Sequence, residues 1–256
     1  MYVVSNQKKE DMRLVIHQPN FVPRLKVLQK IACADRWIVL ETVQYVKQEW
    51  QNRCKILPRT DTHGFWLTLP TCLPVGSRSK IEEVAVPNYK RQLERHRVQL
   101  RSALGGLPYG WQVLDYWDEF ITLAESESES LSQISTVSTL LALRRYAKTP
   151  DVVSSKMVAY TGAKSELVAS ICRHSGATEY IADSGSLNYL RLSDFDPDTI
   201  VRWQDWDSQA NNLGLQSWRD ASFLNVLARK GADFIQELLN APLLVDKLET
   251  SIMLKS

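Results

Sequence analysis

The stretch RLVIHQPNFVPRLKVLQKIACADRWIVLE, residues 13–41, decides the fold. Its first four residues form a largely apolar run that suits a buried strand, and the run stops in a proline-containing loop at 17–20. Apolar residues then recur at helical spacing over 25–34, and a second apolar strand follows at 38–40. A strand, a loop, a helix and a strand over about 30 residues predict the βαβ unit of a parallel sheet.

Polar segments follow both of these strands. Residues 17–20 come directly after the first strand, and residues 41–47 come after the second. Parallel neighbours have their carboxyl ends at one edge of the sheet, which is where ligands bind in such folds. The sequence therefore predicts that both segments line one cleft, with residues 52–53 folding back from the following turn.

Strands and helices alternate through the rest of the chain. The predicted strands are 65–69, 81–86, 152–155, 179–182 and 201–203, and the predicted helices are 89–104, 111–123, 131–147, 164–174 and 222–229. This order predicts an α/β fold, mainly a parallel sheet flanked by helices, with a helical insertion at about 89–148. We expect a single domain over 12–240, a flexible N-terminal extension at 1–11 and a C-terminal tail at 241–256.

The composition is that of an ordinary globular protein. Hydrophobic residues make up 44% of the chain, and 31 Lys and Arg face 29 Asp and Glu, which gives a formal net charge of +2. This balance argues against the basic stripe by which nucleic-acid binders hold phosphates, so we expect no DNA partner. The sequence has neither a membrane-spanning apolar run nor a secretory signal, so we expect a cytoplasmic protein with no membrane contact.

Known sequence signatures of enzymes and metal sites are absent. The four cysteines form no CxxC pair, which indicates reduced thiols rather than a zinc knuckle or a disulfide framework. No GxSxG, Walker A, GxGxxG or HExxH pattern occurs. The tetrapeptide DSGS at 183–186 could hold an anion on its backbone N–H groups, but it is equally common in turns. The sequence predicts no metal ligands and identifies no cofactor.

His17 is the first candidate catalytic residue. It follows the first strand directly, where a neutral imidazole can act as a general base or donate to a phosphate oxygen. The alternative is a structural histidine whose hydrogen bonds end on a backbone carbonyl. Glu41, after the second strand, is a candidate general base or metal ligand, although a lone carboxylate there can also be structural.

Further polar residues of the segment are candidates for substrate binding. Gln18 and Asn20 offer donors and acceptors that can recognise an amide, a sugar hydroxyl or a base edge, or they could simply cap the following helix. Tyr45 could stack on a sugar or a base, as could Trp50, although aromatic side chains beside a strand are often part of the core.

Three cations lie close together in the sequence. Lys47, Arg53 and Lys55 fall within nine residues, and Arg53 can bind a carboxylate or a phosphate in bidentate fashion. This clustering predicts an anionic ligand. Each cation taken alone would be an ordinary solvated side chain.

Several motifs of the chain occur in one known family. The run IHQPNFVP at 16–23, VQY at 43–45 and QNR at 51–53 resemble the opening of WbqC-like proteins. FWLTLP at 65–70, Ser154-Ser155, the GATEYI segment at 176–181 and DASFLNVLARKG at 220–231 resemble later parts of that family. The resemblance extends from Met12 to Gly231.

The sequence also departs from the family pattern. Glu41 is followed by Thr42 where the family has a second acidic residue, and Asn225 stands where the closing region carries Asp. Arg24 and Leu25 replace the usual residues after the second proline. Roles that depend on those acidic residues do not carry over, and the substrate can differ.

The resemblance implies an enzyme that forms an amide bond. It would attach an acyl or aminoacyl group, such as glycyl, to an amine of a nucleotide-linked amino sugar or small metabolite in polysaccharide or specialised-metabolite biosynthesis. His17 would deprotonate the amine or stabilise the leaving group, Lys47 and Arg53 would bind phosphate or carboxylate, and the amides of Gln18, Asn20, Gln44 and Asn52 would orient the substrate. The expected partners are a small-molecule donor and an amine acceptor, with anionic character, and the donor could be an aminoacyl-tRNA or a carrier protein.

Two other hypotheses remain open. A strand, a histidine loop, a helix and a second strand also open nucleotidylyltransferases and acyl-adenylate-forming ligases of the HIGH type, which suggests nucleotidyl transfer or ATP-dependent ligation at the same site. The chain could also be a non-catalytic binding protein of a biosynthetic complex, which would use the polar segment for recognition alone.

Overall fold

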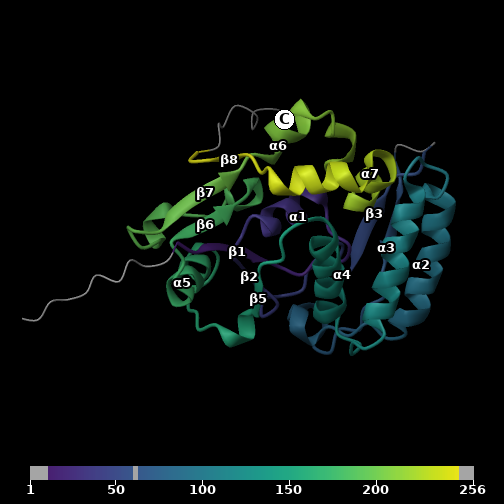
Figure 1. Cartoon of the computed structure of the whole chain (residues 1–256). Coiled ribbons are helices and arrows are strands. Elements are labelled where there is room, and N and C mark those ends of the chain that lie inside the picture. The colour runs from purple at the N-terminus through teal and green to yellow at the C-terminus, as the bar shows by residue number, and fades with distance from the viewer. Residues whose placement is uncertain (1–10, 60–62, 248–256) are drawn as a thin grey trace, which may run out of the picture.

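A computed structural model describes residues 11–59 and 63–247 (Figure 1). Among these residues, six strands form one sheet in the order β5-β2-β1-β6-β7-β8. The strands are β1 (Arg13–His17), β2 (Arg36–Val39), β5 (Asp151–Ser154), β6 (Glu179–Ala182), β7 (Ile200–Gln204) and β8 (Leu244–Val245). All neighbours are parallel except β7 and β8. The predicted α/β fold with a mainly parallel sheet is confirmed.

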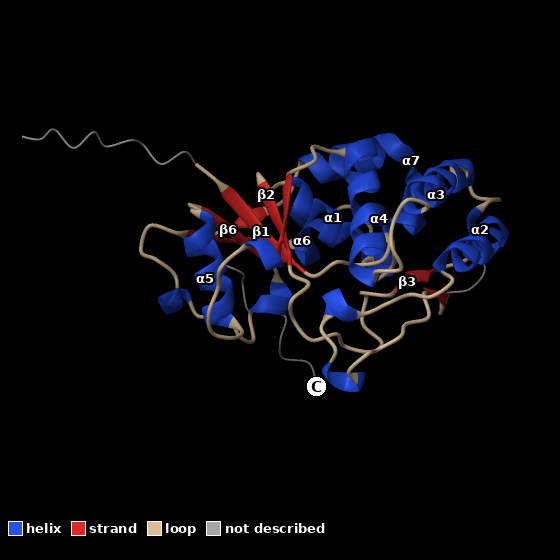
Figure 2. Ribbon diagram, turned by 90° about the horizontal axis from the view of Figure 1, so that it is seen from below, coloured by secondary structure: helices blue, strands red, loops and turns tan. Residues whose placement is uncertain are grey.

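Helices cover both faces of the sheet, as Figure 2 shows. The first face carries α1 (Leu25–Ala32), α4 (Leu131–Tyr146) and α7 (Phe223–Asn240), with α2 (Tyr89–Leu104) and α3 (Gly110–Ala124) beyond them, while α6 (Trp206–Asn212) follows β7. The second face carries α5 (Ser165–Ser175). The two faces follow from the alternation of side chains along each strand. In β1, Val15 packs into the larger core, and Leu14 and Ile16 pack into the smaller one.

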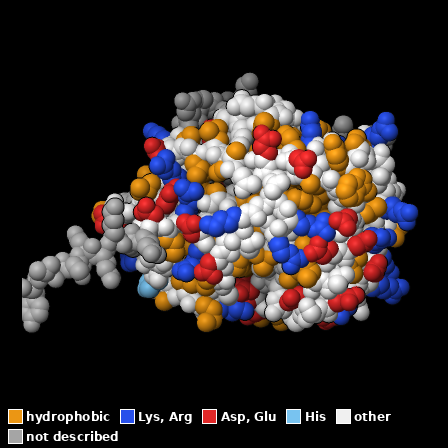
Figure 3. Space-filling view, viewed as in Figure 1, with side chains coloured by type: hydrophobic (Ala, Val, Ile, Leu, Met, Phe, Trp, Pro, Cys, Tyr) orange, Lys and Arg blue, Asp and Glu red, His pale blue; other side chains and the backbone are white. Residues whose placement is uncertain are grey.

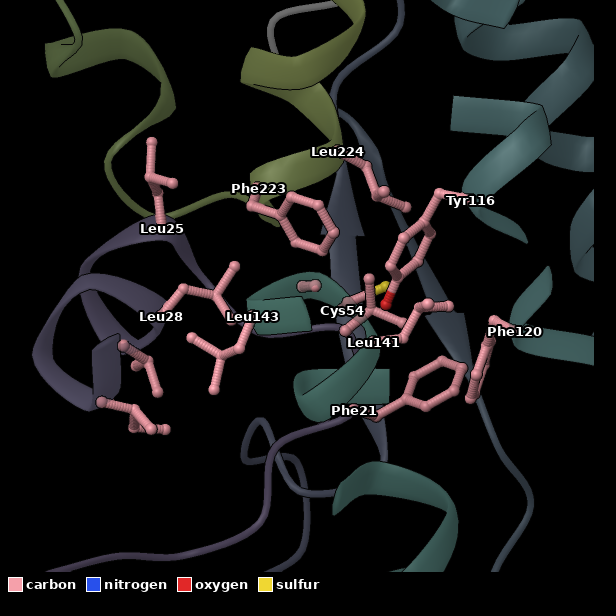
Figure 4. Packing of buried hydrophobic residues seen from close by; sticks show 14 of the residues in the cluster. Phe21, Leu25, Leu28, Cys54, Tyr116, Phe120, Leu141, Leu143, Phe223 and Leu224 are labelled. Atoms are coloured by element: carbon pink, nitrogen blue, oxygen red, sulfur yellow. The ribbon is translucent and has the colours of Figure 1, made fainter. Parts of the chain in front are cut away.

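The larger core is built from several helices and a hairpin. Figure 4 shows side chains of α1, α3, α7 and β3 (Arg53–Ile56) pointing toward one another beside α4. Tyr116 and Phe223 meet edge to face with ring centroids 5.1 Å apart. Strand β3 pairs antiparallel with β4 (Phe65–Thr68), outside the main sheet. On the surface, positive and negative side chains are interspersed over the face shown in Figure 3.

Some predicted elements differ from the structure. The segment predicted as a strand at 81–86 contains a 3-10 turn at Ile81–Glu83, because Ile81 and Glu82 donate their backbone N–H groups to Val43 and Glu41. The helix predicted at 222–229 runs on to Asn240 across a kink at Gly231. Strands β3 and β8 and helix α6 were not predicted, and β8 lies in the segment expected as a tail. Residues 1–10 of the expected extension and 248–256 of the expected tail lie outside the described residues.

Candidate functional site

The strand order reverses direction between β1 and β6. From β1 the chain proceeds through β2 to β5 at one edge of the sheet, and it then crosses by α5 to β6 and β7 on the other side of β1. Such a switch point opens a crevice outside the carboxyl ends of the two strands, which is where open α/β sheets bind ligands. His17 ends β1, and Asp183 follows β6.

Asp183 forms an ion pair with a lysine of the neighbouring helix. Lys30 of α1 is only 3% exposed, and its Nζ donates to Asp183 Oδ2. The other carboxylate oxygen, Oδ1, accepts from the Gly185 backbone N–H at 3.0 Å. Burial opposes ionisation of Asp183, but the positive charge of Lys30 outweighs it and holds the pKa of Asp183 below its usual range. The pair therefore keeps two opposite charges inside the protein.

His17 is half-buried and uncharged near neutral pH. Burial, assisted by the positive charge of Lys30, lowers the pKa of His17 to about 3. Its Nδ1 lies 2.7 Å from the Gln18 carbonyl oxygen, which can only accept a hydrogen bond. Nδ1 must therefore carry the proton, and Nε2 carries the lone pair. The backbone contact expected of a structural histidine is present, but it uses only one of the two ring nitrogens.

Two more cations belong to the same surroundings. Arg24 precedes α1 and lies 3.5 Å from the Asp220 carboxylate, and Lys26 occupies the first turn. Burial lowers the pKa of both side chains, and the positive charge of Arg24 lowers the pKa of Lys26 further. A positive charge that lowers the pKa of a neighbouring cation, as Arg24 does for Lys26, favours an anionic ligand beside the two. The sequence did not single out Lys26 or Lys30 for function.

The loop that carries His17 is tied to the segment that ends at Asn52. Gln51 Nε2 donates to Gln18 Oε1 at 2.7 Å, and the Phe21 backbone N–H donates to the Trp50 carbonyl at 3.0 Å. Asn20 is buried, and its Nδ2 donates to the Pro19 carbonyl. Within the described part of the chain, the hydrogen bonds of the Gln18 and Asn20 side chains go to Gln51 and to the Pro19 carbonyl and not to the first turn of α1, which contradicts the capping alternative. Both residues order the loop in this structure.

Four of the predicted binding residues share a pocket of about 300 Å³. We call it the basic pocket, and its lining residues are Tyr45, Lys47, Gln48, Asn52, Arg53, Thr68, Thr71 and Leu73. It lies beside the β3–β4 hairpin, because Arg53 begins β3 and Thr68 ends β4. The sequence predicted Tyr45, the two cations and Asn52 of this pocket, but it did not predict Gln48, Leu73 or the threonines.

Glu41 lies in a different pocket, of about 540 Å³. We call it the Glu41 pocket, and its lining residues are Val39, Glu41, Glu127, Ser128, Ser130, Ser132, Gln133, Thr136, Val137, Val152, Ser154 and Lys156. Ser154 Oγ donates to Glu41 Oε1, and Lys156 Nζ lies 3.5 Å from the same oxygen. The pocket opens at the carboxyl ends of β2 and β5, one strand away from His17.

The prediction of a single shared cleft is corrected by these positions. Neither the basic pocket nor the Glu41 pocket is lined by His17. After β2 the chain pairs with residues 79–81, where Tyr45 donates its backbone N–H to Ser79. It returns to the His17 loop at Trp50 and Gln51 and then enters β3, whose Arg53 lines the basic pocket and not a pocket shared with His17. Gln44 is bound outside both pockets, through its Nε2 to the Ser77 carbonyl at 2.6 Å.

The described residues contain no cluster of three or more His, Cys, Asp or Glu side chains that could hold a metal ion. Within the same residues, no helix has the length and apolar character to cross a membrane. Burial raises the pKa of the Cys54 thiol, and it raises that of Cys33 to about 11. Neither thiol is therefore poised as a nucleophile at neutral pH.

The fold and the charged group at the switch point define an α/β protein with a candidate ligand site at the carboxyl edge of its parallel sheet. The sequence model of the WbqC-like protein family matches residues 18–227, and the chain belongs to this family. It is similar to the uncharacterized protein Rv1507c of Mycobacterium tuberculosis, with 25% identity over 225 residues that cover 86% of this chain and 95% of that protein. No solved structure shows a significant match.

Proposed function

We propose that the protein is a cytoplasmic transferase that forms an amide bond. It attaches an acyl or aminoacyl group, for example glycyl, to an amine of a nucleotide-linked amino sugar or a small metabolite, in polysaccharide or specialised-metabolite biosynthesis. The observation that carries this proposal is His17, whose uncharged ring has a fixed tautomer and lies at the switch point beside Lys30.

The proposed step uses the lone pair of His17 Nε2. The amine nitrogen attacks the acyl carbon and forms a C–N bond, and the bond from that carbon to the donor's oxygen or sulfur breaks with its electron pair. The proton of the amine passes to Nε2 and then to the leaving group. An imidazole that entered the reaction already protonated could not accept this proton. The lowered pKa of His17 keeps the ring neutral, but it also weakens the ring as a base.

The cations near His17 would serve the anionic parts of the reaction. Lys26, together with Lys30 and Arg24 beside their carboxylate partners Asp183 and Asp220, would stabilise a tetrahedral oxyanion or an anionic leaving group. Burial is the main cause of the lowered pKa of His17, and an anion bound there would offset the smaller part that Lys30 contributes, which raises the basicity of the ring. Binding of the substrate and activation of the base are thereby coupled.

The remaining predicted residues are assigned to substrate binding around this centre. Lys47, Asn52 and Arg53 line the basic pocket, which adjoins the His17 loop through the contact between Gln18 and Gln51. Glu41 lines the pocket on the neighbouring strands. An aminoacyl-tRNA, a carrier protein or a small activated ester would supply the acyl group.

The alternative is nucleotidyl transfer or ATP-dependent ligation at the same centre. It is favoured by the same cations, because enzymes of that type use basic residues to stabilise charge on the phosphate that is attacked. Both alternatives release pyrophosphate from ATP, whereas direct acyl transfer from a preformed donor does not.

The test is turnover with defined donors. The purified protein is incubated with UDP-linked amino sugars and either glycyl-tRNA or glycine with ATP, and products are followed by mass spectrometry together with pyrophosphate release. We expect a product heavier by one glycyl residue, formed from glycyl-tRNA without pyrophosphate. Product only with ATP, accompanied by pyrophosphate, would establish the alternative.

Two variants separate chemistry from folding. His17→Ala should abolish the product and leave the circular dichroism spectrum unchanged. His174→Ala removes an exposed histidine of α5 and should keep full activity. The proposed function fails if His17→Ala retains activity, or if no donor gives turnover, as a purely binding protein would behave.

A further inference from the structure

The basic pocket is lined by cations and by no carboxylate. Lys47 and Arg53 are its charged lining residues, and the others are amides, hydroxyl-bearing side chains and Leu73. Within the described residues neither cation forms a salt bridge, and the Arg53 guanidinium instead lies 4.0 Å above the ring of Trp66. Two positive charges without a neighbouring negative charge attract an anion.

A buried acceptor in the same pocket has no partner. Asn52 is 7% exposed, and its Nδ2 donates to the Leu69 carbonyl at 2.8 Å, while the Leu69 N–H donates back to the Asn52 carbonyl. The first bond needs an N–H donor and therefore fixes the orientation of the side-chain amide, and the second pairs the two backbones. Asn52 Oδ1 is left buried without a hydrogen bond. Buried polar atoms in native proteins are nearly always satisfied, so this oxygen indicates a donor that a ligand brings.

The next residue in the chain, Arg53, also lines the pocket and has a buried donor without an acceptor among the described residues. Arg53 Nη2 donates to the Gln48 carbonyl, but Arg53 Nε has no partner. A ligand that satisfies both atoms needs two groups. One is an acceptor for Arg53, and the other is an O–H or N–H donor for Asn52. A simple inorganic anion supplies only the first of these.

The threonines add hydroxyl recognition. Thr68 and Thr71 line the pocket together with Tyr45. A phosphate monoester carries about −1.5 to −2 charges near neutral pH, which two cations can balance. A zwitterion such as a free amino acid would place its ammonium among these cations, which the charge disfavours. The volume of about 300 Å³ suits a small ligand.

We infer that the basic pocket binds a phosphorylated polyol, with its phosphoryl group on Lys47 and Arg53 and a hydroxyl on Asn52 Oδ1. This site is separate from the switch point at His17 and is joined to it by the contact between Gln18 and Gln51. The assignment of that ligand as a part of a substrate rests on the proposed function, whereas its binding does not.

The test is calorimetric titration of the full chain with three probes. Glycerol 3-phosphate carries both groups, inorganic phosphate carries the anion alone, and glycerol carries the hydroxyls alone. We expect glycerol 3-phosphate to bind about tenfold more tightly than phosphate and glycerol not to bind. Equal affinity for the two anions would overturn the polyol assignment, and no binding of either would overturn the site.

Variants locate the two halves of the ligand. Lys47→Met should lower the affinity for both anions by about tenfold, and Lys47→Arg should restore that affinity. Thr71→Val should lower the affinity for glycerol 3-phosphate and leave the affinity for inorganic phosphate unchanged. Lys55→Met is the matched control, because Lys55 lies two residues from Arg53 but does not line the pocket. An equal loss in Lys55→Met would show that the effect is general surface charge.

The outcome is independent of turnover. If glycerol 3-phosphate binds as expected but no donor gives a product, the assignment of the pocket is supported and the proposed reaction is refuted. The opposite result is turnover while Lys47→Met changes neither the binding of glycerol 3-phosphate nor the KM of the acceptor. That result would support the proposed reaction and refute the ligand assignment of the basic pocket.

Discussion

Lys30 and Asp183 form an ion pair across the switch point of the sheet, although they lie 153 residues apart in the sequence. Lys30 comes from the helix that follows β1, and Asp183 comes from the end of β6. The pair therefore joins the N-terminal βαβ unit to the C-terminal half of the sheet at the point where His17 lies.

Replacement of Asp183 by Asn should strongly destabilise the protein. It leaves Lys30, which is 3% exposed, as a buried charge without its partner, and we expect a loss of about 3–5 kcal/mol in the free energy of unfolding. Urea denaturation measures it. Asp151→Asn breaks the exposed pair with Arg36 and should cost about 1 kcal/mol or less. Equal losses in the two variants would show that burial of the Lys30–Asp183 pair does not make its disruption more costly than that of an exposed pair.

Stability should rise with pH between about 4 and 6.5 because of His17. Its pKa is about 3 in the folded protein and 6.5 in the unfolded chain, so over this range the unfolded state binds the additional proton. Each such proton contributes a slope of up to about 1.4 kcal/mol per pH unit. The stabilisation is complete above pH 6.5 and is lost as the pH falls toward 3.

The His17→Gln variant isolates this contribution. Urea denaturation at several pH values should show a shallower slope in the variant than in the wild type. The slope will not vanish, because burial also lowers the pKa of His96, to about 4. Identical slopes in the two proteins would mean that the pKa of His17 does not differ between the folded and unfolded states.

The contact between Gln18 and Gln51 should appear as a coupling energy. Gln51 is buried and donates to Gln18 Oε1 at 2.7 Å, so a double-mutant cycle with Gln18→Ala and Gln51→Ala should give about 0.5–1.5 kcal/mol. The cycle is read from urea denaturation of the four proteins. Purely additive losses would mean that the two loops are not energetically linked.

Gly231 should not tolerate a side chain. Its φ of +83° and ψ of 175° belong to a region that only glycine adopts readily, and an added Cβ would lie 2.9 Å from the ring of Tyr109. We expect Gly231→Ala to lower the free energy of unfolding by about 1–3 kcal/mol or more. Gly176→Ala is the control, since its φ is +70° but no atom lies within 4 Å of the added Cβ. A larger loss at Gly176 would contradict the steric argument.

The fold was predictable because its decisive signals are local. Residues 13–16 and 38–40 are short apolar runs separated by a helical pattern, and β1 and β2 are parallel neighbours as that pattern requires. The clustering of Lys47 and Arg53 was also visible, because both lie on a short stretch of chain that lines one pocket.

The partners of the candidate site were not predictable, because they are set by tertiary contacts. Lys30 resembles a solvated helical lysine in the sequence, and it is buried only because β6 brings Asp183 to it. Ile81 and Val84 fit a strand by their apolar character, but the backbone of that segment bonds to residues 41–43 and turns. The expected single cleft was wrong for the same reason, since tertiary contacts place Glu41 and Arg53 in two pockets that His17 does not line.

The position of β1 between β2 and β6 has a consequence for synthesis of the protein on the ribosome. β1 emerges first, but its second edge cannot pair until β6 has been made, about 160 residues later. At 5–20 residues per second the nascent chain waits roughly ten to thirty seconds with that edge open and with Lys30 lacking its counter-charge. Chaperones that shield exposed strand edges should therefore associate with chains stalled before residue 179 and release those that have passed residue 204.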